Sequence, residues 1–177
     1  MIGRFQLIIP LFLSFCIAAC HDKKEVVETN KLTQKQVTEK LLDANKSAIE
    51  LENTQINNLI KSSGWEMIET PTGLRYQVLE KGNGPKASPG KLVRFEYEVK
   101  LYSGEMIYSS AKSGPKEFSI GSGGVESGLE EGILLLRVGD KARLIIPSYL
   151  AHGLSGDQDR IPPKATLIYT LKLIDLK

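Results

Sequence analysis

The C-terminal two thirds of the chain alternate between apolar and polar residues, a pattern that predicts β-strands. In the longest run, residues 93–101, apolar side chains hold every odd position and charged ones every even position. Successive side chains of a strand point to opposite faces, so this run predicts a strand with one buried face and Tyr97 on it. Shorter runs predict four more strands, around residues 74–78, 118–120, 142–146 and 167–173.

One short helix interrupts this series of strands. Val125, Leu129 and Ile133 recur every four residues after the glycine-rich turn 121–124. The helix falls between the third and fourth predicted strands. This order predicts an α+β fold, in which a twisted antiparallel sheet wraps around one short helix.

A second helix is predicted over residues 32–63, where apolar side chains recur at spacings of three, four and seven without proline or glycine. Gly64 ends it. Leu42, Ile49 and Ile56 lie seven residues apart, but Asn45 and Glu52 interrupt the stripe. We therefore expect the helix to pack on its own domain rather than form a strong coiled coil, with a homodimer through residues 32–63 as the other option.

The N-terminus has the features of an exported protein. Residues 1–19 carry one basic side chain, Arg4, and an apolar stretch that is too short to span a membrane. They end in Ile17-Ala18-Ala19, and with Cys20 this resembles the lipobox of bacterial lipoprotein precursors. We expect residues 1–19 to be cleaved and Cys20 to be lipidated; a plain signal peptide with a chance cysteine is the alternative. Polar residues 20–31 predict a flexible tether, and residues 65–177 the folded domain.

Charge and motif content exclude several function classes. The chain has 23 basic and 21 acidic residues, a balance that gives no reason to expect a nucleic-acid partner. Its two histidines, His21 and His152, cannot form a metal cluster by themselves. No Ser/His/Asp set, Cys-x-x-Cys pair or phosphate-binding glycine loop is present. We therefore expect no metal, no cofactor and no covalent catalytic residue.

Two features point to a binding cavity instead. Ile161-Pro162-Pro163 leads straight into the last strand and predicts a rigid loop at the rim of the sheet, where binding sites are common. Tyr97 and Tyr169 face inward from different strands. They either pack as core residues with bonded hydroxyls or form the walls of an aromatic cavity, and the pattern alone leaves both readings open.

Over residues 85–177 the chain resembles the FKBP-type peptidyl-prolyl isomerases. The resemblance implies a twisted antiparallel sheet over one short helix, enclosing a small apolar pocket in which a prolyl ring docks. It rests on an ordered series of segments: Gly90 with 93–97, Gly104 through Ser110, Phe118 through Gly121, Val125 through Gly132, Val138-Gly139-Asp140, Ile146-Pro147, Leu150 through Gly153, and Ile161 through Leu167.

The same resemblance implies the pocket residues. Tyr97, Val125 and Tyr169 keep family-like side chains, and Ile161 lies in the rim loop. Five positions depart from the family pattern: Ile107 in place of a wall phenylalanine, Tyr108 in place of an aspartate, Glu126 in place of an aliphatic residue, Leu129 in place of an aromatic floor, and His152 in place of a hydrogen-bonding tyrosine.

These departures differ in their expected effect. Leu129 keeps the floor apolar, and His152 keeps a hydrogen-bond donor. Glu126 matters little if its carboxylate points to solvent. The loss of the aspartate at position 108 weakens the polar corner most.

Two functions from different classes follow. The N-terminal features with Thr72 through Tyr76 resemble the gliding-motility-associated FKBP-like lipoproteins. We expect an isomerase anchored through Cys20, in the outer membrane facing the periplasm, that acts on proline-containing segments of envelope proteins. The alternative is a non-catalytic binding module, chaperone or structural part of a motility or secretion machine. An open apolar hollow would favour the enzyme, whereas a hollow filled by Tyr108 or Glu126 would favour the binding module.

Overall fold

The computed structural model describes residues 33–177. The predicted signal segment 1–19, the tether 20–31 and Cys20 lie outside the described residues. Among residues 33–177, no helix has both the length and the apolar character needed to cross a membrane.

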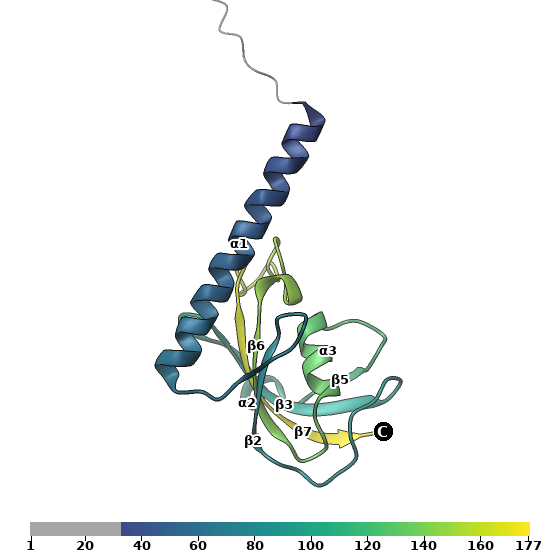
Figure 1. Ribbon diagram of the computed structural model, residues 1–177. Helices are drawn as coiled ribbons and strands as arrows, with labels where there is room; N and C mark the ends of the chain where they lie inside the picture. Colours follow the sequence, from purple (N-terminus) through teal and green to yellow (C-terminus); the bar gives the residue numbers. More distant parts are fainter. Residues whose placement is uncertain (1–32) are drawn as a thin grey trace, which may run out of the picture.

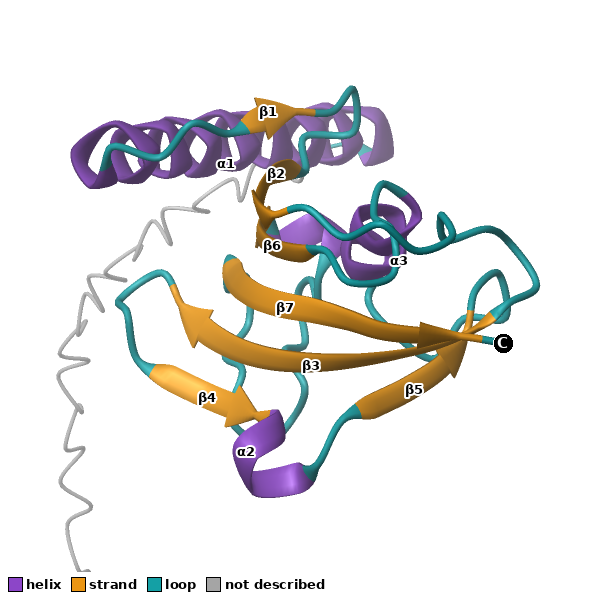
Figure 2. Cartoon of the chain, turned by 90° about the horizontal axis from the view of Figure 1, so that it is seen from below, coloured by secondary structure: helices purple, strands orange, loops and turns teal. Residues whose placement is uncertain are grey.

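The described chain forms a seven-stranded antiparallel sheet, as the alternating pattern predicts (Figures 1 and 2). The strand order is β1-β2-β6-β7-β3-β4, and β5 pairs with β3. The strands are β1 (Ile68–Glu69), β2 (Arg75–Glu80), β3 (Leu92–Leu101), β4 (Met106–Ser109), β5 (Lys116–Ser119), β6 (Lys141–Ile146) and β7 (Leu167–Leu176).

The predicted short helix is α3 (Ser127–Leu134), and it lies where expected, between the strands predicted at 118–120 and 142–146, which are β5 and β6 of the structure. Sequence reasoning missed β1, which has two residues, and β4, whose Met106-Ile107-Tyr108 run does not alternate. It also missed the four-residue helix α2 (Ser110–Ser113) and the 3₁₀ turn η1 (Ser148–Leu150). The predicted class, a sheet with a short helix on its concave face, is confirmed.

The main core lies between α3 and the concave face of the sheet. Val93, Phe95, Tyr97 and Val99 of β3 are buried, while the residues between them are exposed. Helix α3 packs so closely on β6 that a Cβ atom added at Gly132 would lie 2.5 Å from Cδ1 of Leu144. This close contact fixes the C-terminal half of α3 relative to the sheet.

Helix α1 (Gln34–Ser63) begins and ends where the sequence predicts to within two residues. Thr33 caps its first turn together with Gln36, and Gly64 ends it in the left-handed conformation. Only its C-terminal part packs on the domain: Ile56 is buried against Ile145 and Ile168, on the sheet face opposite α3. The N-terminal half extends past the body of the domain (Figure 1). The predicted packing therefore holds for the second half of α1 alone.

Candidate functional site

A cavity of about 630 Å³ opens at the concave side of the sheet. Its walls come from β3, β4, β5 and β7, the end of α2, the segment before α3, and the loop that joins β6 to β7. The lining residues are Tyr97, Val99, Tyr108, Ser113, Lys116, Gly124, Val125, Glu126, Ala151, His152, Asp157, Ile161 and Tyr169.

The two inward-facing tyrosines are both core residues and cavity walls. Tyr97 and Tyr169 are only 6% and 3% exposed. The ring of Tyr97 packs on Phe95, with centroids 5.8 Å apart, and the Lys116 ammonium lies 5.7 Å from its centre. The two readings that the sequence left open therefore do not exclude each other, since both tyrosines belong to the core cluster and both line the cavity.

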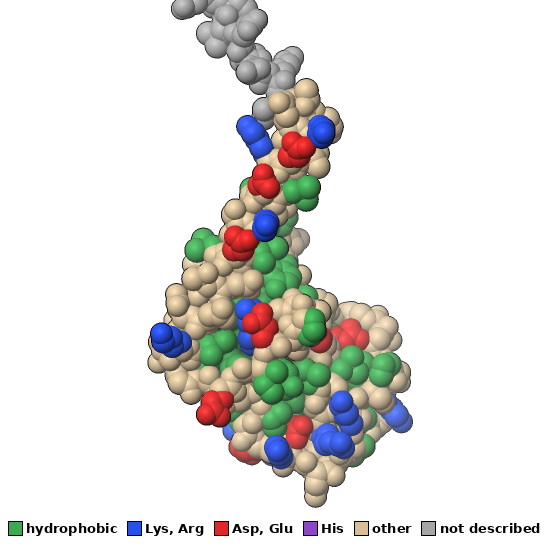
Figure 3. All heavy atoms as spheres, viewed as in Figure 1, with side chains coloured by type: hydrophobic (Ala, Val, Ile, Leu, Met, Phe, Trp, Pro, Cys, Tyr) green, Lys and Arg blue, Asp and Glu red, His purple; other side chains and the backbone are tan. Residues whose placement is uncertain are grey.

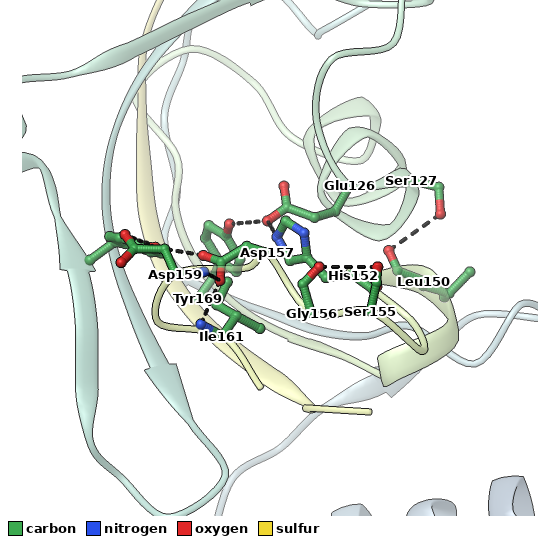
Figure 4. A network of polar contacts seen from close by, with 11 residues as sticks. Glu126, Ser127, Leu150, His152, Ser155, Gly156, Asp157, Asp159, Ile161 and Tyr169 are labelled. Atoms are coloured by element: carbon green, nitrogen blue, oxygen red, sulfur yellow. Dashed lines mark hydrogen bonds and ion pairs between the residues drawn. The ribbon is translucent and has the colours of Figure 1, made fainter. Parts of the chain in front are cut away.

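Glu126 turns its carboxylate into the cavity. The side chain is 7% exposed, and its Oε1 accepts hydrogen bonds from the Tyr169 hydroxyl at 2.8 Å and from His152 Nε2 at 3.0 Å (Figure 4). Because a carboxylate only accepts, we assign the proton of His152 to Nε2. The condition under which Glu126 would matter little, a carboxylate that points to solvent, is therefore not met, because two donors on other elements hold the side chain in the cavity.

The same contacts affect Tyr169. Burial, followed by the charge of Glu126 and the hydrogen bond to it, raises the pKa of the Tyr169 phenol well above its ordinary value. The phenol therefore stays protonated and acts as a donor at every physiological pH.

A second carboxylate, that of Asp157, also lines the cavity, and sequence reasoning missed this residue. The Tyr108 hydroxyl donates to Asp157 Oδ2 at 2.5 Å and to Asp159 Oδ2 at 3.2 Å. Asp157 Oδ1 accepts from the backbone N–H groups of Ile161, at 2.7 Å, and Asp159, at 3.0 Å. The loop between β6 and β7 thus supplies a carboxylate next to position 108, where the family has an aspartate. The sequence signal that could have predicted Asp157 was the Asx-type turn Asp157-x-Asp159.

These contacts fix the charge of Asp157. Burial alone would raise its pKa, but hydrogen bonds from Tyr108 and from backbone N–H groups outweigh burial and lower the pKa to about 2. Burial and the hydrogen bond to Asp157 raise the pKa of Tyr108. The cavity wall therefore holds an ionised carboxylate bound to a neutral phenol.

The other predicted site residues separate into two groups. Val125, His152 and Ile161 line the cavity with the two tyrosines. Ile107 and Leu129 do not line it: they are 3% and 0% exposed and belong to the core beneath. Leu129 lies on the face of α3 that packs into the core, so it supports the cavity floor from below. Pro162 and Pro163 are exposed and face away from the cavity, so of the rim tripeptide only Ile161 contributes.

The cavity suits non-covalent binding of a peptide segment. Apolar surface from Tyr97, Val125, Ile161 and Tyr169 is flanked by donors and by the two carboxylates. Within residues 33–177, no three potential metal ligands cluster.

Comparison with known proteins places this architecture in a family. A family model described as FKBP-type peptidyl-prolyl cis-trans isomerase matches residues 84–174. The chain belongs to this family. The matched segment agrees with residues 85–177 of the sequence resemblance and contains every residue that lines the cavity.

Individual FKBP relatives support the assignment. The chain is 41% identical over 108 residues to FK506-binding protein 4 of Dictyostelium discoideum, covering 61% of this chain and 29% of that protein. It is 30% identical over 169 residues to a probable FKBP-type isomerase, FkpA, of Neisseria meningitidis, covering 89% and 61%. The crystal structure of FkpA from Escherichia coli superimposes with a TM-score of 0.64 at 28% identity, over 83% of this chain and 74% of that one. The chain thus spans less than two thirds of the length of these two sequence relatives.

Proposed function

We propose that this FKBP-family protein is a peptidyl-prolyl cis-trans isomerase whose substrate proline docks in the cavity between Tyr97 and Tyr169. The observation that carries the proposal is the cavity itself, which has a volume of about 630 Å³, opens at the concave face and is lined by three tyrosines and four aliphatic residues. It lies within the segment that matches the isomerase family model.

The reaction needs no nucleophile. Amide resonance opposes rotation with a barrier of about 18–20 kcal/mol, and uncatalysed prolyl isomerisation takes about 10 to 100 s. The planar amide is more polar than the twisted one, so apolar walls at Tyr97, Val125 and Ile161 disfavour the planar form. Lowering the barrier by about 4 kcal/mol would accelerate rotation about a thousandfold.

A protease-free isomerisation assay with Val125→Asp tests the proposal. Val125 is only partly buried, so the variant should fold. Docking of a prolyl ring would remove water from the new carboxylate, and this desolvation opposes binding. We expect kcat/KM to fall about a hundredfold, the factor for about 3 kcal/mol. Val37→Asp, the same substitution on the exposed half of α1, is the matched control. Equal activity in both variants would place catalysis elsewhere.

A non-catalytic binding module is the second candidate, and Glu126 is the observation that favours it. Its carboxylate fills part of the cavity and holds Tyr169 and His152 in hydrogen bonds. Titration calorimetry with a proline-containing peptide separates the two functions. Saturable binding that is lost in Val125→Asp, without any catalysis by the wild-type chain, would establish the binding module.

For the cellular setting, we propose a lipoprotein of the cell envelope. Residues 1–19 would be the signal, Cys20 the lipidated residue and residues 20–31 the tether, with the domain facing the periplasm from the outer membrane. Support comes from the apolar stretch ending in Ile17-Ala18-Ala19-Cys20. Envelope proteins, including parts of a gliding-motility apparatus, would be the clients. Metabolic labelling with a fatty acid should mark the wild-type chain and not Cys20→Ala.

We also propose a homodimer through the helix 32–63. The projecting half of α1 carries exposed apolar side chains, which Figure 3 shows as green patches along the helix. The most exposed of them are Leu41 and Leu42, at 59% and 63%.

A further inference from the structure

Glu52, on α1, makes an unusual set of contacts with the loop that joins β6 to β7. Its Oε1 accepts from the Ser148 backbone N–H at 2.7 Å and from the Thr166 hydroxyl at 2.5 Å. Its Oε2 accepts from the Ser148 hydroxyl at 2.8 Å. One half-buried carboxylate on the N-terminal helix thus binds two residues that are distant from it in sequence.

Those two residues are the ends of the loop. Ser148 begins η1, directly after β6 and Pro147, and Thr166 directly precedes β7. Between them lie Ala151, His152, Asp157 and Ile161, which form one wall of the candidate prolyl pocket. The loop lies beside α1, and residues of both elements line a shared groove (Figure 1).

The conformation of this loop depends on such contacts. Gln158 and Lys164 have φ angles of 63° and 58°, in the left-handed region that costs free energy for residues other than glycine. The loop forms no strand between Ser148 and Thr166. On the pocket side it is held by the bond from Tyr108 to Asp157, and on the opposite side by Glu52. Hydrogen bonds to a carboxylate are stronger than those between neutral groups, and Glu52 accepts three of them.

We propose that Glu52 is a positioning residue of the pocket: by fastening both ends of the 148–166 loop, it makes the N-terminal helix set the geometry of the pocket wall. Glu52 touches no lining residue of the pocket and acts only through Ser148 and Thr166. The consequence for catalysis rests on the proposed isomerase function, whereas the ordering of the loop does not.

The test is Glu52→Gln in the full chain, read by amide hydrogen exchange and by kinetics. Amides of residues 148–166 should exchange at least about tenfold faster, while those of β3 and β7 stay unchanged. KM should rise about threefold to tenfold with kcat nearly constant, because bound substrate selects the ordered loop. An anchor that only holds α1 in place would not produce this separation of KM from kcat.

Two further variants make the test specific. Glu50→Gln removes the same charge from an exposed position two residues away and should change neither readout. Thr166→Val removes one donor and should reproduce part of the effect in the wild-type background but add nothing to Glu52→Gln.

The inference is overturned by unchanged loop exchange in Glu52→Gln, by an equal effect of Glu50→Gln, or by faster exchange confined to α1. If the wild-type chain shows no catalysis, the proposed function fails, but the exchange measurement still decides whether Glu52 orders the loop.

Discussion

Glu126 brings a negative charge into the pocket, and donors from two other elements hold it there. We predict that Tyr169→Phe lowers the free energy of unfolding by about 1 to 2 kcal/mol, because the buried carboxylate loses one of its hydrogen bonds. In a Glu126→Leu background the same change should cost less than about 0.5 kcal/mol, since the acceptor is already absent. Urea unfolding of the four proteins measures both values, and equal costs in the two backgrounds would mean that this bond contributes nothing.

Asp157 gives the pocket a pH dependence on the acidic side. Its pKa is lowered to about 2 in the folded protein, so its contribution to stability is complete above the ordinary carboxyl range near 4 and is lost as pH falls through about 2. We predict that Tyr108→Phe raises the pKa of Asp157, because it removes the strongest of the hydrogen bonds that lower it. Carboxyl-carbon NMR titration reports this pKa directly, with Asp175 as an internal reference on a strand far from the bond.

Pocket residues could be predicted from the sequence where backbone periodicity decides their direction. Tyr97 and Tyr169 are in this class, since alternation along β3 and β7 sets which face they occupy. The direction of Glu126 could not be predicted, because it depends on where Tyr169 and His152 lie in three dimensions. Asp157 was missed because it lies in a loop, where no repeating pattern of residues indicates the direction of a side chain.

At the scale of elements, the close contact of α3 with β6 limits what the helix tolerates. Alanine normally stabilises a helix interior by up to about 1 kcal/mol relative to glycine. At Gly132 we predict the reverse, a loss of about 1 to 3 kcal/mol, because the new methyl group would lie 2.5 Å from Leu144 Cδ1. Thermal unfolding should show a lowered Tm, and adding Leu144→Ala should cost less than the sum of the single changes. A Tm at or above that of the wild type would contradict the contact.

The boundaries of helices and strands could be predicted where a capping residue or a long run of alternating residues marked them. The helix α1 has Thr33 at one end and Gly64 at the other, and β3 has ten residues. Strand β1 has two residues and is held by pairing with β2 rather than by any pattern of its own. Such elements depend on tertiary contacts and leave no local signal.

For the whole molecule, the projecting half of α1 exposes apolar side chains, among them Leu41 and Leu42. We predict that the chain is a dimer at tens of micromolar in light scattering, and that Leu41→Lys with Leu42→Lys makes it monomeric by placing charges on the apolar stripe. Thr38→Lys with Ser47→Lys adds the same charge at exposed polar positions of the same helix and should leave the dimer intact. A monomeric wild-type chain would rule out this interface.

Catalysis of prolyl isomerisation in the cavity between Tyr97 and Tyr169 can be observed by two-dimensional exchange NMR on a proline-containing peptide mixed with the full chain. We predict cis–trans exchange cross-peaks at substoichiometric protein, together with shift changes at the amides of Val125 and Ile161, and the loss of both in Val125→Asp. Exchange cross-peaks that persist in Val125→Asp, or shift changes confined to other surfaces, would contradict this prediction.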